Sequence, residues 1–167
     1  LAPNFAGTSS SAPSGVAANG YDANDGVDLT LAVSADLAVD TSSDAITVTL
    51  GTSSAAATSA GSATSSATLE LDLEDYETIT LVSQGGANTV ADLDAGDATK
   101  LVINASKALT ITDFAGGTSA VKTIDASGSS ANVVVGATDN LAMTITGGSG
   151  NDTFTVGTTG SSVSGGA

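Results

Sequence analysis

The second half of the chain repeats a pattern of two short strands about every 20 residues. Ile103, Ile124 and Ile145 fall at equal intervals of 21 residues, and turn-forming residues follow each of them. A second short strand is expected after each turn, at Leu109–Thr112, Val133–Val135 and Phe154–Val156. A repeat of this length with two strands is typical of a β-solenoid, whose rungs stack because none buries its apolar face alone. We therefore expect an all-β fold of parallel β-solenoid or β-roll rungs.

The first half is less regular but also shows strand periodicity. Apolar residues recur at every second position in residues 29–33, 46–50 and 69–73, with other residues between them. Residues 1–20 hold both prolines and many Ser, Gly and Ala, which indicates a linker. We expect an irregular β-rich segment with a low-complexity loop at 21–68, followed by the solenoid at 69–167. A β-sandwich with regular hairpins is the alternative that this strand spacing allows.

Composition limits the chemistry that the chain can carry. It has no Cys and no His, which excludes disulfides, thiolate or His-ligated metal sites, and Cys or Ser-His-Asp catalysis within this chain. Paired carboxylates, which glycosidases use, are present but cannot be told apart from calcium ligands. We therefore expect no enzymatic activity. The sequence has no apolar run of about 18 residues, so it predicts no transmembrane helix.

The charge is strongly negative. Eighteen carboxylates face three lysines, the net charge is −15, and fifteen of the acids are Asp. Such a surface repels nucleic acid, which is therefore not an expected partner. Asp is the short carboxylate that is common in turns and calcium loops, and bound divalent cations would relieve the self-repulsion. The alternative is that the acids only keep the protein soluble.

One segment fits a defined metal-binding motif. Residues 147–155 read GGSGNDTFT and match every fixed position of the nonapeptide G-G-x-G-x-D-x-U-x, where U is a large apolar residue. Glycines reach backbone conformations that turn carbonyl groups toward one point, the Asp carboxylate adds a charged oxygen, and calcium prefers six or more oxygens. The alternative is an ordinary Gly-Asn-Asp turn. The first candidate calcium site is therefore Gly147, Gly148, Gly150, Asn151 and Asp152.

A second candidate calcium site lies near the N-terminus. Asp22, Asn24, Asp25 and Asp28 surround a glycine, and oxygens at positions one, three and seven of this segment resemble an acidic calcium loop. It is not an EF-hand, because Val33 stands at the twelfth position, where a bidentate Glu is required. A solvated turn is an equally good interpretation of this segment.

A third acidic cluster, Asp92, Asp94 and Asp97, is expected in a loop between rungs. Bare Asp-rich turns are usually solvated, so metal binding is the lesser alternative here. In residues 70–74 acids alternate with leucines, which places the acids on one face of a strand. We expect this face to be exposed.

The motif at 147–155 is similar to the repeats of the repeats-in-toxin (RTX) family, which form calcium-loaded parallel β-rolls. Gly165 and Gly166 restart the glycine pattern 18 residues after Gly147, and this spacing is one full β-roll turn in that family. We therefore interpret the chain as a piece of a longer protein. The stretches LELDLEDYETITLVS (69–83) and KLVINASKALTITDF (100–114) resemble the calcium-binding surface-layer (S-layer) proteins of Gram-negative bacteria. The resemblance covers roughly residues 69–167, with the solenoid ending in RTX-type repeats.

The resemblance implies a structural, calcium-dependent, self-assembling protein of the cell surface. Such a protein leaves the cell by type I secretion, folds outside, where calcium is abundant, and joins its copies into a two-dimensional lattice. The implied cofactor is Ca²⁺, and the implied partners are further copies of the chain and, as a candidate anchor, cell-surface lipopolysaccharide. Two alternatives stay open: a stalk segment of a large RTX adhesin, and the β-roll of a secreted RTX hydrolase.

Overall fold

The computed structural model describes residues 4–5, 29–32, 43–51, 69–73, 76–114, 121–138, 142–157 and 160–166. This described part is all-β, with thirteen strands, and it holds no helix long and apolar enough to cross a membrane. The strands are β1 (Asn4–Phe5), β2 (Leu29–Ala32), β3 (Ala45–Leu50), β4 (Leu69–Asp72), β5 (Thr78–Ser83), β6 (Asn88–Asp94), β7 (Lys100–Ala105), β8 (Leu109–Phe114), β9 (Thr123–Asp125), β10 (Val133–Thr138), β11 (Thr144–Thr146), β12 (Thr153–Thr155) and β13 (Ser162–Ser164).

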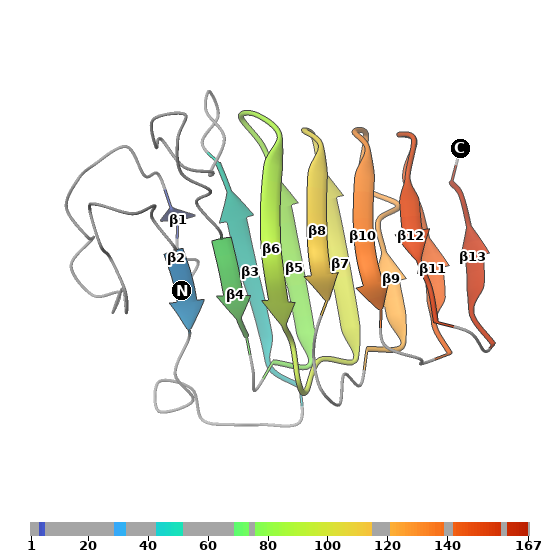
Figure 1. Cartoon of the computed structure of the whole chain (residues 1–167), viewed down its shortest axis with the longest axis horizontal. Helices are drawn as coiled ribbons and strands as arrows, with labels where there is room; N and C mark the ends of the chain where they lie inside the picture. The colour runs from blue at the N-terminus through green and yellow to red at the C-terminus, as the bar shows by residue number, and fades with distance from the viewer. Residues whose placement is uncertain are drawn as a thin grey trace.

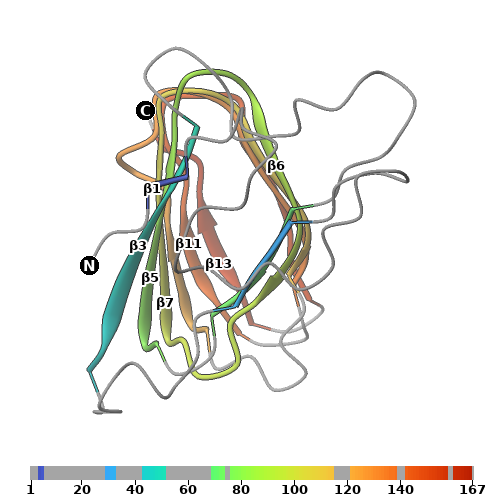
Figure 2. The ribbon, with the colours of Figure 1, turned by 90° about the vertical axis from the view of Figure 1, so that its left-hand side faces the viewer.

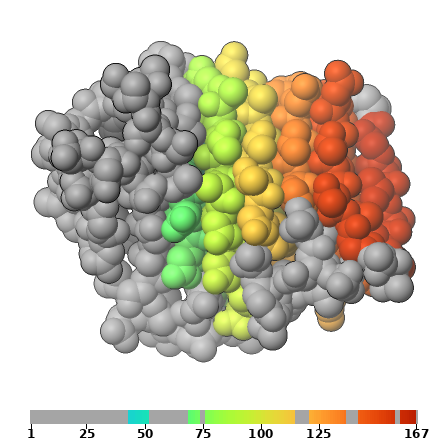
Figure 3. Space-filling model, in the orientation of Figure 1, coloured from blue at the N-terminus to red at the C-terminus, as the bar shows by residue number. Residues whose placement is uncertain are grey.

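The strands alternate between two parallel sheets that face each other. The odd sheet has the order β1-β3-β5-β7-β9-β11-β13, and the even sheet has the order β12-β10-β8-β6-β4-β2. Each turn of the chain therefore adds one strand to each sheet, and the rungs follow one another along the long axis (Figures 1 and 2). In the space-filling view, successive rungs form adjoining bands in sequence order (Figure 3).

All pairs among the described strands are parallel. This arrangement confirms the predicted all-β fold of parallel β-solenoid rungs. A β-sandwich built from hairpins would need antiparallel neighbours, so the described strands exclude that alternative.

The core is a set of side-chain columns between the sheets. Ile79, Leu101, Ile124 and Ile145 lie opposite one another on successive strands of the odd sheet, and each is at most 1% exposed. Small side chains such as Ala95 are buried in the same core. Stacked rungs about 4.8 Å apart let aliphatic and small residues fill the interior, so the chain builds a core with few aromatic residues.

The equal spacing of Ile103, Ile124 and Ile145 does not correspond to one column. Ile124 lies opposite Leu101, 23 residues earlier, whereas Ile145 lies 21 residues after its partner Ile124. Ile103 lies opposite Leu81 instead. The 21-residue spacing therefore differs by two residues from the register between β7 and β9. Because strand side chains alternate with period two, all three isoleucines still point into the core.

Strands from the first half of the chain belong to the same two sheets. The six residues of β3 lie opposite the six residues of β5, from Ala45–Thr78 to Leu50–Ser83. In the even sheet, β2 pairs with β4 from Leu29–Leu69 to Ala32–Asp72. Solenoid stacking therefore includes strands that lie before residue 69.

Candidate functional site

The glycine motif forms the corner between β11 in the odd sheet and β12 in the even sheet. Its first two glycines, Gly147 and Gly148, are buried. The N–H of Gly147 donates to the carbonyl oxygen of Ser164 on one side (2.7 Å), and the N–H of Ser149 donates to that of Ser129 on the other (3.0 Å). The corner is therefore held between the turn of the preceding rung and the end of β13.

The glycines are required here because backbone from other rungs occupies the space of a side chain. A Cβ at Gly148 would overlap the carbonyl oxygen of Ser129, and one at Gly150 would lie 2.6 Å from that of Ala131. A Cβ at Gly166 would overlap the carbonyl oxygen of Gly148. Gly166 also has φ of 74°, in the left-handed region that favours glycine. The two glycine turns therefore form a cradle of bare backbone.

The Asp152 carboxylate bridges this corner and the preceding rung. Oδ2 accepts the N–H of Gly148 in its own turn at 2.7 Å, and Oδ1 accepts the N–H of Val133 in β10 at 2.9 Å. An ionised carboxylate has about four lone-pair sites on its two oxygens. Two of them are used by these bonds, so the others can face a cation.

The oxygen atoms of the corner fit a hard cation that backbone groups would hold. Among the described residues, no three His, Cys, Asp or Glu side chains lie together as a metal-binding group, so a cation here would depend on carbonyl oxygens. Those of Gly147 and Gly148 face the backbone of Gly166, and Asp152 supplies the carboxylate. Carbonyl and carboxylate oxygens are the ligands that calcium prefers. Asn151 is exposed.

The second candidate site, at Asp22, Asn24, Asp25 and Asp28, lies outside the described residues. It stays a prediction.

The third acidic cluster was assigned to a loop, and this was wrong for two of its members. Asp92 and Asp94 lie in strand β6, and only Asp97 lies in the following turn. Val90 and Leu93 of β6 are both buried although they are three residues apart, so the alternation is broken inside the strand. This break made the acids resemble the start of a turn.

The strand register brings these acids next to others that are distant in sequence. Glu70 of β4 lies opposite Asp92 of β6, which lies opposite Asp113 of β8. These three residues form a carboxylate ladder on the even sheet, and Asp72 and Asp94 face each other beside it. The sequence analysis missed the ladder, although its spacings of 22 and 21 residues match the rung length.

The ladder concentrates negative charge on one face. Like charges directly opposite each other destabilise a sheet. Burial raises the pKa of Asp94, and the carboxylates of Asp72 and Asp92 raise it further. Oδ1 of Asp92 is buried and accepts no hydrogen bond from the described residues. This face therefore stores electrostatic repulsion in the folded state.

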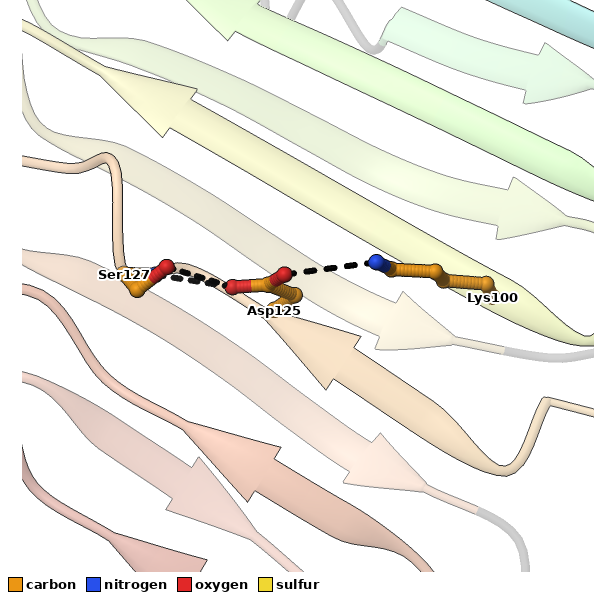
Figure 4. A network of polar contacts seen from close by, with 3 residues as sticks. All are labelled: Lys100, Asp125 and Ser127. Carbon is orange, nitrogen blue, oxygen red and sulfur yellow. Dashed lines mark hydrogen bonds and ion pairs between the residues drawn. The ribbon is translucent and has the colours of Figure 1, made fainter.

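On the odd sheet, by contrast, a lysine and an aspartate pair their opposite charges (Figure 4). Nζ of Lys100 lies 3.3 Å from Oδ2 of Asp125 on the next strand. The hydroxyl and N–H of Ser127 both donate to Oδ1 of Asp125, at 2.6 and 3.3 Å. The Ser127 hydroxyl lowers the pKa of Asp125 most; its N–H and Lys100 add to this, and partial burial opposes it. This network fixes the start of the turn after β9.

Comparison of the chain with protein-family models, curated proteins and solved structures finds no match. The resemblance to RTX and S-layer proteins therefore depends on the motif and the strand pattern. The function proposed below is inferred from the residues and contacts of the chain.

Proposed function

We propose that the chain is a structural, calcium-dependent, self-assembling protein of the bacterial cell surface, of the S-layer type. The observation that carries the proposal is the corner at residues 147–152. There a carboxylate and backbone carbonyls lie beside Gly148, Gly150 and Gly166, whose positions leave no room for a Cβ. The solenoid supports the structural part of the proposal, because stacked rungs present long regular faces.

The charge of the chain supports the dependence on calcium. A net charge of −15 opposes both folding and lateral packing of copies, and the carboxylate ladder places part of this charge on one sheet face. A cation that binds the folded chain and not the unfolded chain stabilises it in proportion to the logarithm of its concentration. Calcium would therefore favour folding first, and assembly once the repulsion between copies is reduced.

The proposal includes the route and location that the resemblance suggests. The chain would be exported by type I secretion, fold outside the cell and join a two-dimensional lattice of identical copies. Lipopolysaccharide is the proposed anchor, because phosphate-bearing surface groups and acidic protein faces can share bridging divalent cations. No catalytic role is part of the proposal.

A calcium titration of the purified chain tests this function. Circular dichroism would follow β structure and light scattering would follow particle size, with magnesium at the same ionic strength as the ionic control. We expect β signal and particle size to rise with calcium and not with magnesium. Asp152→Asn should weaken the response. Asp97→Asn, which removes an exposed charge in another turn, is the matched control and should preserve it.

The same titration separates the alternatives. A chain that is folded, monomeric and indifferent to calcium contradicts the proposal and favours a passive adhesin stalk. A chain that folds with calcium but stays monomeric at all concentrations favours the β-roll of a secreted hydrolase. Only calcium-dependent folding together with growth of particles supports the surface-layer function.

A further inference from the structure

We propose that cation dependence is confined to one end of the solenoid, residues 147–166, and that the rungs from β3 to β10 fold without a cation. This inference rests on the proposed calcium function of the corner at 147–152. It divides the chain into a self-sufficient body and a cation-dependent end, and the division follows from how three corners of the solenoid are closed.

The first upstream corner, between β5 and β6, is closed by a buried amide. Nδ2 of Asn88, a residue 1% exposed, donates to Oγ of Ser83 at 2.8 Å and to the carbonyl oxygen of Gly86 at 3.0 Å. It also lies 3.2 Å from the carbonyl oxygen of Gln84. Carbonyl oxygens that a turn directs inward therefore receive a side-chain donor. This corner has no need of a cation to neutralise them.

The corner between β9 and β10 is closed in a similar way by a hydroxyl. Ser129 is 3% exposed, and its Oγ donates to the carbonyl oxygen of Ile103 at 2.8 Å. The same oxygen accepts the N–H of Ala105 at 3.0 Å. A single hydroxyl thus satisfies one donor and one acceptor of the preceding rung. Backbone bonds from Ser130 and Ala131 to the carbonyl oxygen of Ala105 complete the contact.

The corner at 147–152 lacks such an internal donor. Its buried positions are Gly147 and Gly148, which have no side chain. The side chain that it turns inward is the carboxylate of Asp152, which can only accept hydrogen bonds when ionised. Carbonyl oxygens and a carboxylate therefore gather there without the neutral donor that Asn88 or Ser129 supplies upstream. A bound cation is the group that would fill this role.

Burial changes at the same point of the chain. Ile145 is 1% exposed, whereas Val163, which lies opposite it on the next strand, is 51% exposed. In the even sheet Val135 is fully buried, and its neighbour Phe154 is only half-buried. Apolar burial is the main stabilising contribution to a rung. Among the described strands, β12 and β13 each have a neighbouring strand on one side only, so they receive less of this contribution than β10 and β11.

Hydrogen exchange of the intact chain, measured by mass spectrometry, tests the inference. Exchange is compared in chelator and in calcium at about 100 times the dissociation constant. Amides in β5 to β10 should be protected in both conditions. Amides at 147–166 should exchange rapidly in chelator, and calcium should slow them by up to about 100-fold if it binds only the ordered form.

Two variants test where along the chain the cation dependence begins. Asp152→Asn should weaken the calcium-induced protection at 147–166 and leave β5 to β8 protected. Ser129→Ala leaves the N–H of Ala105 without its acceptor, so it should speed exchange around Ala105 equally with and without calcium. If instead the Ser129→Ala effect disappears in calcium, the rung around Ala105 depends on calcium and the confined dependence is wrong.

The outcomes for the unaltered chain separate this inference from the proposed function. If β5 to β10 also become protected only with calcium, the confined dependence is wrong while the calcium function stands. If calcium changes exchange nowhere, both are wrong. Protection that changes only at 147–166 supports both.

Discussion

The N–H of Val133 in β10 donates to Oδ1 of Asp152 in the following rung, across 2.9 Å. The other oxygen of the same carboxylate accepts the N–H of Gly148 at 2.7 Å. Asp152 therefore has two functions in the folded chain: it shapes its own turn, and it docks that turn onto a strand that is already paired with β8. If the Asp152 carboxylate binds a cation, these two hydrogen bonds already hold it in a fixed orientation.

This bond makes the amide of Val133 a reporter for the docked corner. Asp152→Ala leaves that partly buried N–H without its acceptor, a loss that typically costs about 1–3 kcal/mol. In calcium, NMR exchange of the Val133 amide should become faster, while the amide of Val135 within the β10 ladder should change little. Asp152→Asn retains one side-chain oxygen and should have the smaller effect. Equal protection of Val133 in all three proteins would contradict the bridging role.

The cradle predicts a contrast between Gly148 of the motif and Gly165 of the following glycine turn. A Cβ at Gly148 would meet backbone of the preceding turn, at Ser129 and Ala126, whereas a Cβ at Gly165 has no atom within 4 Å. Because backbone cannot move aside cheaply, Gly148→Ala should cost about 1–3 kcal/mol and shift the calcium titration to higher concentration. Gly165→Ala, the matched control, should change stability by less than about 0.5 kcal/mol. Thermal unfolding in calcium measures both.

A loss of calcium response in Gly165→Ala equal to that in Gly148→Ala would overturn this contrast. It would mean that the glycines act through backbone flexibility and not through the close approach of the two turns.

The Asp72–Asp94 pair beside the carboxylate ladder predicts that removing one of these charges stabilises the protein. Burial and the charges of Asp72 and Asp92 raise the pKa of Asp94 above its ordinary value of 3.8. The folded state therefore favours protonated Asp94, and this contribution is present below pH 3.8 and lost as the pH rises through the folded-state pKa. Asp94→Asn should be more stable than the unaltered chain at pH 7 and equal to it near pH 3. Urea unfolding across this range measures the difference.

Replacing Asp125 should change the stability at pH 7 in the opposite direction from replacing Asp94. Hydrogen bonds from Ser127 and the nearby Lys100 lower its pKa, so its contribution is present above pH 3.8 and lost as the pH falls through the folded-state pKa. Asp125→Asn should therefore be less stable at pH 7, by about 0.5 kcal/mol as for other surface ion pairs, and added salt should reduce the difference. A variant that gains stability at pH 7 would show that the network in Figure 4 does not stabilise the turn.

The sequence predicts the fold better than it predicts the register. Alternation identified β3 and β4, because buried and exposed positions there follow period two. The offset that places Ile124 opposite Leu101 depends on the length of the connections between rungs, which periodicity does not report. For the same reason the carboxylate ladder could not be predicted, because Asp92 and Asp113 are neighbours only in the register that the structure shows.

The candidate site was only partly predictable. The glycine spacing identified the corner at 147–152, since few other residues could occupy Gly148 or Gly150. Asn88 and Ser129 could not be distinguished from the many other polar residues of a Ser-rich chain. What sets them apart is burial and the acceptors they meet, and both come from tertiary contacts.

The burial contrast along one core column gives the last prediction. Ile124 is fully buried between Leu101 and Ile145, whereas Val163 at the end of the same column is 51% exposed. Ile124→Ala should cost about 2–5 kcal/mol, because it leaves a cavity in a packed rung. Val163→Ala should cost much less, about 0.5 kcal/mol, as for surface positions. Urea unfolding of dilute protein in calcium measures both.

The stability loss of Val163→Ala, measured at several protein concentrations, then tests whether this strand takes part in assembly. In dilute solution a large loss in Val163→Ala would contradict the exposure of the solenoid end. A loss that is small in dilute protein and grows with protein concentration would instead show that association buries Val163. Since binding stabilises a folded chain by mass action, that result would place strand β13 among the contacts between copies.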